Sequence, residues 1–319
     1  MEYDTNKMKQ KKRTTLVVFS VIFLLLIVGC DKANQETLVG DSPYAGGTKG
    51  LVAEFEEMGF FNEESGMEEI FWDETFPIEV VLKNKGEEAI PVDGVKVTLL
   101  GLNLGDFENI GSSGSLLNRE IIEEVSEFNE EGGEIMLDFT SDTDDAKYTI
   151  VFPGTSYDIS IFANIEYDYQ THSSVPKVCF KGNLKDPSVC KVDETKDVFS
   201  SAAPIQVKSV EEKRAGTGKV ALEFQIENVG AGKVTKKGEA FDPRFDRLSY
   251  TISDTDNWDC RTGGRANEAR LDEEGKATVI CRWKGTPLTE DDIYTKQVDL
   301  TLNYKYKEII QKQIRIKST

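Results

Sequence analysis

The segment YDISIFANIEYDY, residues 157–169, decides the fold class, because apolar and polar side chains alternate along it with Phe162 as the one exception. Alternation with period two places one face of a strand on a core and the other in water, as in an antiparallel sheet with one solvated side. Residues 298–307, VDLTLNYKYK, repeat the pattern. Short strands separated by turn signals are also predicted elsewhere, so the sequence predicts an all-β protein: these strands are Leu51–Phe55, Val95–Leu99, Ile135–Phe139, Val220–Ile226, Leu248–Ile252, Ala277–Trp283 and Ile314–Ile316.

An internal repeat organises the chain. Residues 78–86 match residues 222–230, and both segments end in Asn-x-Gly. Three further matches follow in the same order: 129–132 with 272–275, 154–155 with 285–286, and 165–169 with 302–306. Ordered matches of this kind indicate a duplication. We therefore expect two tandem antiparallel β-sandwiches, residues 50–199 and 200–319, joined by an exposed linker near residues 195–204.

The strand–turn motifs Val80-x-Leu82-x-Asn84-x-Gly86 and Phe224-x-Ile226-x-Asn228-x-Gly230 resemble the second strand of CARDB-type domains. These are immunoglobulin-like modules of prokaryotic cell-surface proteins, often adhesion-related, and the paired Tyr-x-Tyr strands are similar to those of archaeal surface proteins. The later glycine loops at Gly132 and Gly275 fit the same pattern. The resemblance implies immunoglobulin-like sandwiches and a surface role, and it supplies no catalytic residue.

The first copy departs from this pattern between Gly101 and Phe128. Apolar side chains there fall near helical spacing, at Leu117, Ile121, Val125 and Phe128. This spacing predicts a short amphipathic helix that covers one end of the first sandwich.

The N-terminus has the sections of a secretory signal. Basic residues between 7 and 13 precede an apolar run at 16–28, which is too short for a membrane span of about 20 residues. Residues 27–30, Ile-Val-Gly-Cys, resemble the lipobox of prokaryotic lipoproteins. The resemblance implies a signal peptide at 1–29, a lipidated Cys30 and an extracytoplasmic location at the cell membrane. Residues 30–49 are expected to be a flexible tether. The alternative is an uncleaved signal anchor.

Four cysteines remain after Cys30. Disulfides are typical of proteins outside the cytoplasm. We expect Cys179–Cys190 and Cys260–Cys281, since each pair stays inside one predicted domain and closes a short loop. The alternative is a zinc site of four thiolates, although none of the four belongs to a C-x-x-C pair.

Charge and motifs argue against several functions. The net charge of −19 repels nucleic acid. The single histidine, His172, lies in a predicted exposed turn, and no phosphate loop or metal-binding His-Glu pattern occurs. Acidic stretches 142–145 and 254–256 are more typical of solvated turns than of calcium loops. Trp258, Trp283 and Tyr294 could line a carbohydrate face, but the strand position of Trp283 favours the core. The sequence therefore predicts no catalytic residue, metal or cofactor.

These patterns favour a lipid-anchored cell-surface protein that acts as a non-enzymatic binding, adhesion or structural module, with an unidentified surface protein or glycan as its partner. One alternative is a subunit of a cell-envelope assembly, such as a filament or secretion complex, that pairs its edge strand with the next subunit. The other is a surface hydrolase that uses paired carboxylates.

Overall fold

The computed structural model describes residues 42–141, 143–186 and 188–318, and the chain from Pro43 onward forms one compact unit. This part is all-β, as predicted, and most of its strand pairs are antiparallel. Its helical structure is the 3-10 helix η1, Leu104–Asp106, and no helix within it is long and apolar enough to cross a membrane. The predicted signal peptide, Cys30 and most of the predicted tether lie outside the described residues.

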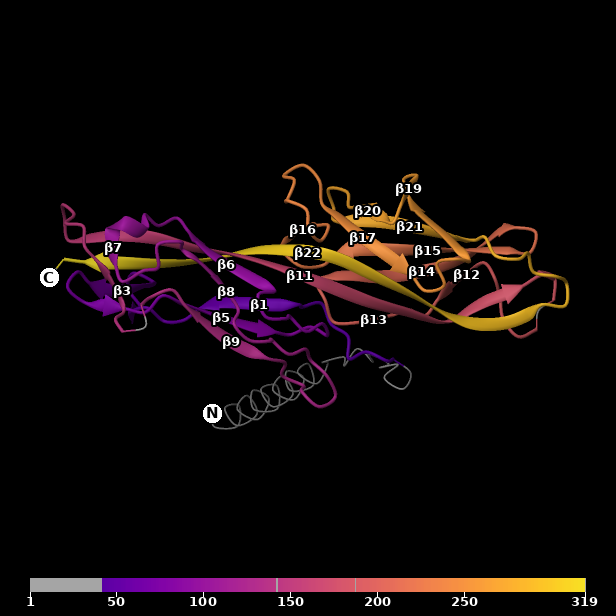
Figure 1. Ribbon diagram of the computed structural model, residues 1–319, viewed down its shortest axis with the longest axis horizontal. Coiled ribbons are helices and arrows are strands. Elements are labelled where there is room, and N and C mark those ends of the chain that lie inside the picture. The colour runs from indigo at the N-terminus through magenta and orange to yellow at the C-terminus, as the bar shows by residue number, and fades with distance from the viewer. Residues whose placement is uncertain (1–41, 142, 187, 319) are drawn as a thin grey trace, which may run out of the picture. The chain divides into compact units, whose positions relative to one another are not determined.

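Two long strands carry the fold. Strand β11, Ser156–Lys181, and strand β22, Ile293–Lys317, pair antiparallel from Ser156 opposite Lys317 to Lys181 opposite Ile293 (Figure 1). The register shifts once, between Val175 and Val178. At about 3.3 Å per residue, each strand runs for roughly 80 Å. The alternating segments 157–169 and 298–307 are therefore strands, as predicted, within elements much longer than the patterns that revealed them.

The two long strands belong to a sheet of ten strands within the described residues, which runs in the order β2-β3-β22-β11-β6-β8 with side branches. Strands β13, β16, β17 and β20 form these branches: β13 pairs with β11, β16 and β17 pair with β22, and β20 pairs with β17. The remaining bounds are β2 Phe60–Asn62, β3 Met67–Phe71, β6 Val95–Leu100, β8 Ser115–Leu117, β13 Phe199–Ser200, β16 Lys233–Thr235, β17 Arg247–Ile252 and β20 Glu268–Arg270.

Residues 42–318, apart from positions 142 and 187, form three further sheets. One has the order β1-β5-β9, one the order β12-β14-β15-β21-β18-β19, and a small one the order β4-β10-β7. The bounds are β1 Leu51–Phe55, β4 Thr75–Phe76, β5 Glu79–Asn84, β7 Phe107–Glu108, β9 Glu134–Asp138, β10 Ala146–Tyr148, β12 Glu194–Lys196, β14 Ile205–Gly216, β15 Lys219–Asn228, β18 Trp258–Thr262, β19 Arg265–Ala266 and β21 Lys276–Trp283.

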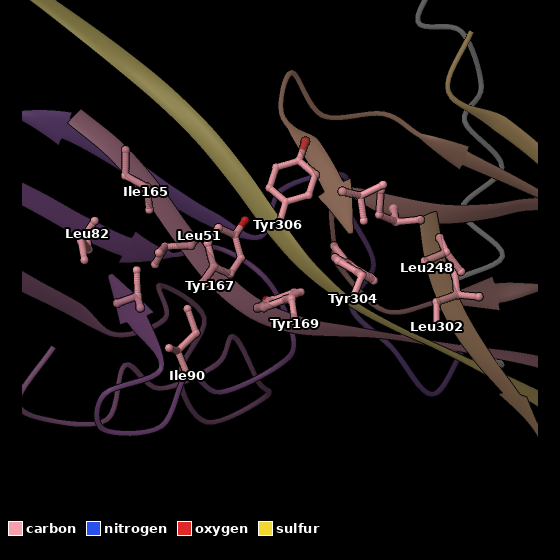
Figure 2. Close-up of a cluster of buried hydrophobic side chains, with 14 of the residues drawn as sticks. Leu51, Leu82, Ile90, Ile165, Tyr167, Tyr169, Leu248, Leu302, Tyr304 and Tyr306 are labelled. Atoms are coloured by element: carbon pink, nitrogen blue, oxygen red, sulfur yellow. The ribbon is translucent and has the colours of Figure 1, made fainter. Parts of the chain in front are cut away.

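The core lies on one face of the β11–β22 ladder. At its centre Tyr167 pairs with Tyr306 and Tyr169 pairs with Tyr304, and all four rings are at most 2% exposed (Figure 2). The cross-strand ring centroids lie 5.8 and 6.3 Å apart. These rings and the aliphatic side chains around them are removed from water. Burial of such apolar surface is the main contribution to the stability of a sandwich-like arrangement.

The Asn-x-Gly motif of the first copy folds into a compact corner. Asn84 is fully buried, and its Oδ1 accepts hydrogen bonds from the Tyr169 hydroxyl at 3.0 Å and from Gly86 N at 3.2 Å. Its Nδ2 donates to Glu88 O at 2.7 Å. Glu88 N donates to the Tyr169 hydroxyl at 3.3 Å. The amide therefore closes the turn and ties the end of β5 to β11.

The second copy builds the same corner from the matching residues. Asn228 Oδ1 accepts from the Tyr306 hydroxyl at 3.3 Å and from Gly230 N at 3.2 Å, and Asn228 Nδ2 donates to Gly232 O at 2.9 Å. Gly232 N donates to the Tyr306 hydroxyl at 2.7 Å. We call each arrangement an Asn–Tyr corner. The sequence matches at 78–86 and 165–169 with 222–230 and 302–306 thus correspond to one structure formed twice.

The predicted helix between Ser115 and Phe128 is wrong. Residues 115–117 form β8, and Ile122 makes an antiparallel bridge with Ile90. Ile122 is fully buried, whereas Ile121 and Phe128 are 57% and 98% exposed. The residues at the predicted spacing therefore form no buried helical face, because the segment is extended and its backbone bonds to Gly86, Ile90 and Gly133 instead of to itself.

The predicted turn at His172 and the predicted linker are also wrong, for a common reason. His172 lies within β11, and Ser201 N donates to its carbonyl oxygen. The small residues that suggested an exposed linker, Ser201 to Pro204, are buried, and Phe199–Ser200 pairs with β11. Small polar side chains are used here for close packing between backbones. Hydrogen bonding is continuous across position 199/200, and the assignment of 50–199 and 200–319 to separate sandwiches stays a prediction.

The end of the predicted tether is held in place. The Glu87 carboxylate accepts hydrogen bonds from Ala45 N and Gly46 N, both at 2.9 Å, and from Ala202 N at 2.7 Å. One carboxylate therefore fixes residues from two distant parts of the chain.

Candidate binding groove

A concave site lies among four loops of the second copy. It has a volume of about 920 Å³ and is lined from four ranges: 228–233, which follows β15; 243–246, which precedes β17; 262–265, between β18 and β19; and 270–275, between β20 and β21. We call it the arginine groove, after Arg244, Arg265 and Arg270 in its lining.

Short-range hydrogen bonds set the shape of these loops. The Asn228 side chain closes the first loop within the Asn–Tyr corner. Asp272 Oδ1 accepts from Glu274 N and Lys276 N, and Gly275 takes a φ of 77° that suits glycine. Asp246 links two loops, because its carboxylate accepts from Val234 N while its backbone carbonyl accepts from Leu271 N.

A cation–aromatic stack lies in the lining. The Arg270 guanidinium lies over the Phe245 ring, 3.4 Å from its centroid, and the Arg244 guanidinium lies 5.1 Å from the same centroid. A flat guanidinium that stacks on a ring keeps its N–H donors free at the edge, where they can bind a carboxylate or another acceptor.

The charges of the groove are unevenly paired. Arg244 forms a bidentate contact with Asp242, which lowers the pKa of that carboxyl to about 2, and Arg265 pairs with Glu268 at 3.2 Å. Arg270 is exposed and makes no ion pair with any described residue. The lining also holds four carboxylates, Asp246, Asp272, Glu273 and Glu274, against four cations, so Arg270 is an unpaired cation in a groove whose lining has no net formal charge.

The predicted disulfides are both formed, and none of the four cysteines lines the groove. Cys179–Cys190 joins the end of β11 to the loop that follows it, with the Cα atoms 5.7 Å apart. Cys260–Cys281 joins directly opposed residues of β18 and β21. The alternative of a four-thiolate zinc site is therefore wrong. Cys30 lies outside the described residues.

The other predicted candidates are separate from the groove. His172 Nε2 lies 3.4 Å from Glu88 Oε2, and this contact raises the pKa of the imidazole. Trp258 and Trp283 are at most 9% exposed and pack with Phe180, so both belong to the core, while Tyr294 is 40% exposed. Across residues 42–318, apart from positions 142 and 187, no group of three or more His, Cys, Asp or Glu side chains is placed to hold a metal ion.

One buried carboxyl has a strongly perturbed pKa. Burial raises the pKa of Glu212 to about 7, although both carboxylate oxygens accept from the single Cys179 N–H and one lies 3.0 Å from Lys196 Nζ. Such shifts often mark functional groups. The Glu212 side chain is fully buried, however, so we interpret it as a structural bridge beside the Cys179–Cys190 disulfide.

Sequence reasoning missed the arginine groove. The signal was present as a local excess of arginine in an acidic chain, at Arg244, Arg261, Arg265 and Arg270, next to an aromatic residue in a turn-rich stretch. Which of these side chains share a concavity depends on loops that only the fold brings together. Comparison of the chain with protein-family models and with curated proteins finds no match.

Proposed function

We propose that the protein is a lipid-anchored module on the extracytoplasmic face of the cell membrane, built from two immunoglobulin-like sandwiches of the CARDB type, that binds a partner without catalysing a reaction. The arginine groove carries this proposal, because it combines a concave surface with an exposed, unpaired Arg270 stacked on Phe245. A few polar groups that converge in a concavity are typical of binding sites. The two disulfides support the location, since they persist outside the reducing cytoplasm.

Photo-crosslinking in intact cells tests the binding role. A photoreactive amino acid at Ala231, which is exposed in the groove lining, should capture a covalent partner on the cell surface. The matched control is Lys208, which is exposed on β14 and lies outside the groove. Equal capture at both positions, or none at either, would contradict the proposal.

Replacement of the predicted lipidation site tests the anchor. Cys30→Ser should release the protein from the membrane fraction, since a mature N-terminus without acyl chains has no means of insertion. The same fractionation of wild-type protein is the control. Unchanged membrane association would favour the signal-anchor alternative.

A second candidate is the subunit of an envelope assembly, which the edge of the ten-stranded sheet favours. Strand β2 is the last strand at that edge, and its Phe60 and Phe61 are 77% and 56% exposed. An exposed apolar edge strand is a template for pairing with another chain. Chemical crosslinking of cells should then give oligomers that Phe60→Lys abolishes, whereas a monomer in both cases would argue against assembly.

A further inference from the structure

The two Asn–Tyr corners provide matched reference points for comparing the copies. Asn84 and Gly86 in the first copy correspond to Asn228 and Gly230 in the second by sequence match and by their hydrogen bonds. Gly132 corresponds to Gly275 by sequence match, by its positive φ and by its turn bond, although Asn84 N bonds to Gly133 O where Asn228 N bonds to Gly275 O. The three second-copy residues all line the arginine groove. The first-copy residues therefore show what lies in the equivalent place there.

In the first copy this place is filled by the chain itself. Val125 N donates to Gly86 O at 2.8 Å, and Gly133 N donates to Glu123 O at 2.9 Å. Ile122 and Ile90 exchange two backbone hydrogen bonds, at 2.9 and 3.0 Å. A bonded carbonyl at one residue and a bonded amide two residues later is the pattern of an extended chain that docks on an edge. Residues 119–125 thus act as an internal ligand of the first copy.

The second copy lacks this segment. Strands β8 and β20 are equivalent, since each pairs with the matching strand of its copy, β6 or β17. Fifteen positions separate Leu117, at the end of β8, from Gly132, whereas five separate Arg270, at the end of β20, from Gly275. The shorter connection cannot cover the corner, and the place is open as the arginine groove.

Two groups in the groove are left for a ligand. The Gly230 carbonyl, which matches the acceptor of the Val125 amide, receives no hydrogen bond from the described residues. Arg270 has no carboxylate partner among them. The internal ligand of the first copy, Arg-Glu-Ile-Ile-Glu-Glu-Val at 119–125, is rich in glutamate and has branched aliphatic side chains.

We propose that the arginine groove binds an extended acidic peptide segment of a partner protein, whose backbone bonds to Gly230 as Val125 bonds to Gly86. A carboxylate of the peptide pairs with Arg270, and a branched aliphatic side chain lies over Gly275 as Val125 lies over Gly132. This inference rests on the proposed binding function and names its ligand class. The backbone hydrogen bond to Gly230 contributes affinity, and pairing with Arg270 favours a carboxylate at that one position of the peptide.

A peptide titration with the whole protein tests the inference. The probe is a labelled, end-capped peptide of sequence Arg-Glu-Ile-Ile-Glu-Glu-Val-Ser, copied from residues 119–126. We expect saturable binding that Arg270→Ala weakens at least tenfold. The control is Arg282→Ala, since Arg282 is also exposed but lies on β21 outside the groove. A probe with its three glutamates replaced by lysine should not bind.

The remaining outcomes overturn the inference. No binding of the acidic probe, equal binding of the lysine probe, or equal loss in both arginine variants would each exclude an acidic peptide site at Arg270. Capture of a glycan from Ala231 in intact cells, with no peptide binding, would keep the groove as a binding site and exclude a peptide ligand. A failed peptide titration is thereby distinguished from a failed binding function.

Discussion

The two copies share one Asn–Tyr corner and differ in what covers it. In the first copy residues 119–125 lie on the corner and bury Ile122 completely. In the second copy the same place is a groove of about 920 Å³. The hydrogen-bonded corner is thus a constant scaffold, and the length of one connection decides whether it is closed by the chain or open to a ligand.

The copies also differ in surface character. The first copy and the adjacent part of β22 expose apolar side chains such as Phe60, Phe128, Met136, Val151 and Ile309. Both disulfides and the arginine groove lie in the part built around β14, β15 and β21. Apart from Val189 and Tyr294, the large exposed apolar side chains of the described residues therefore lie in the first copy and the adjacent part of β22.

The largest expected difference in stability between the copies is at Ile122. Ile122→Ala should lower the free energy of unfolding by about 4 kcal/mol, because it leaves a cavity in the closed copy. The neighbouring Ile121→Ala is the control and should change stability by less than about 0.5 kcal/mol, since Ile121 is 57% exposed. Chemical denaturation measures both. Similar losses in the two variants would mean that the segment does not close the first copy.

The matched glycines sharpen the same contrast. Gly132 and Gly275 have φ values of 71° and 77°, so alanine is strained at both. A Cβ at Gly132 would also overlap the Asn84 carbonyl oxygen and lie 3.3 Å from Val125 Cγ2, whereas at Gly275 the nearest atom is Asn228 Cβ at 3.3 Å. We expect Gly132→Ala to cost about 3 kcal/mol and Gly275→Ala about 1 kcal/mol. Thermal denaturation measures both losses of stability. Equal losses in the two variants would mean that the two glycines are packed alike.

Sequence patterns predict the repeated elements, but they do not predict the segment that makes the copies different. Alternation along 157–169 and the ordered Asn-x-Gly matches predict strands and a duplication because each strand carries its own periodic signal. Residues 119–125 carry a misleading signal, because Ile121 and Val125 fall at helical spacing while the conformation depends on bonds to Gly86, Ile90 and Gly133. His172 was misplaced for a similar reason: Thr171 and Ser173 suggest a turn, but their hydroxyls bond to Ile205 O and Ser200 Oγ across the packed interior.

The stability of the part around β14 should depend on pH through the ionisation of Glu212. Its pKa is raised from 4.5 to about 7 in the folded protein, so the native state binds more protons than the unfolded state between these values. The stabilisation is complete below about pH 4.5 and is lost as pH rises through about 7. Wild-type protein should therefore lose up to about 3 kcal/mol more than Glu212→Gln between pH 4.5 and 8. Parallel pH curves for the two proteins, from urea denaturation, would exclude Glu212 as the cause.

The smallest expected effect tests what the copies have in common. The Tyr169 and Tyr306 hydroxyls each donate to an Asn Oδ1 and accept from a backbone N–H, and burial raises the pKa of both, that of Tyr306 to about 12. Tyr169→Phe and Tyr306→Phe should therefore each cost about 1 kcal/mol, and the two losses should agree within about 0.5 kcal/mol. Tyr294→Phe, at a 40% exposed ring, should change little. A large loss at Tyr169 with none at Tyr306 would mean that the open groove weakens its corner. Equal losses would place the whole difference between the copies in residues 119–125.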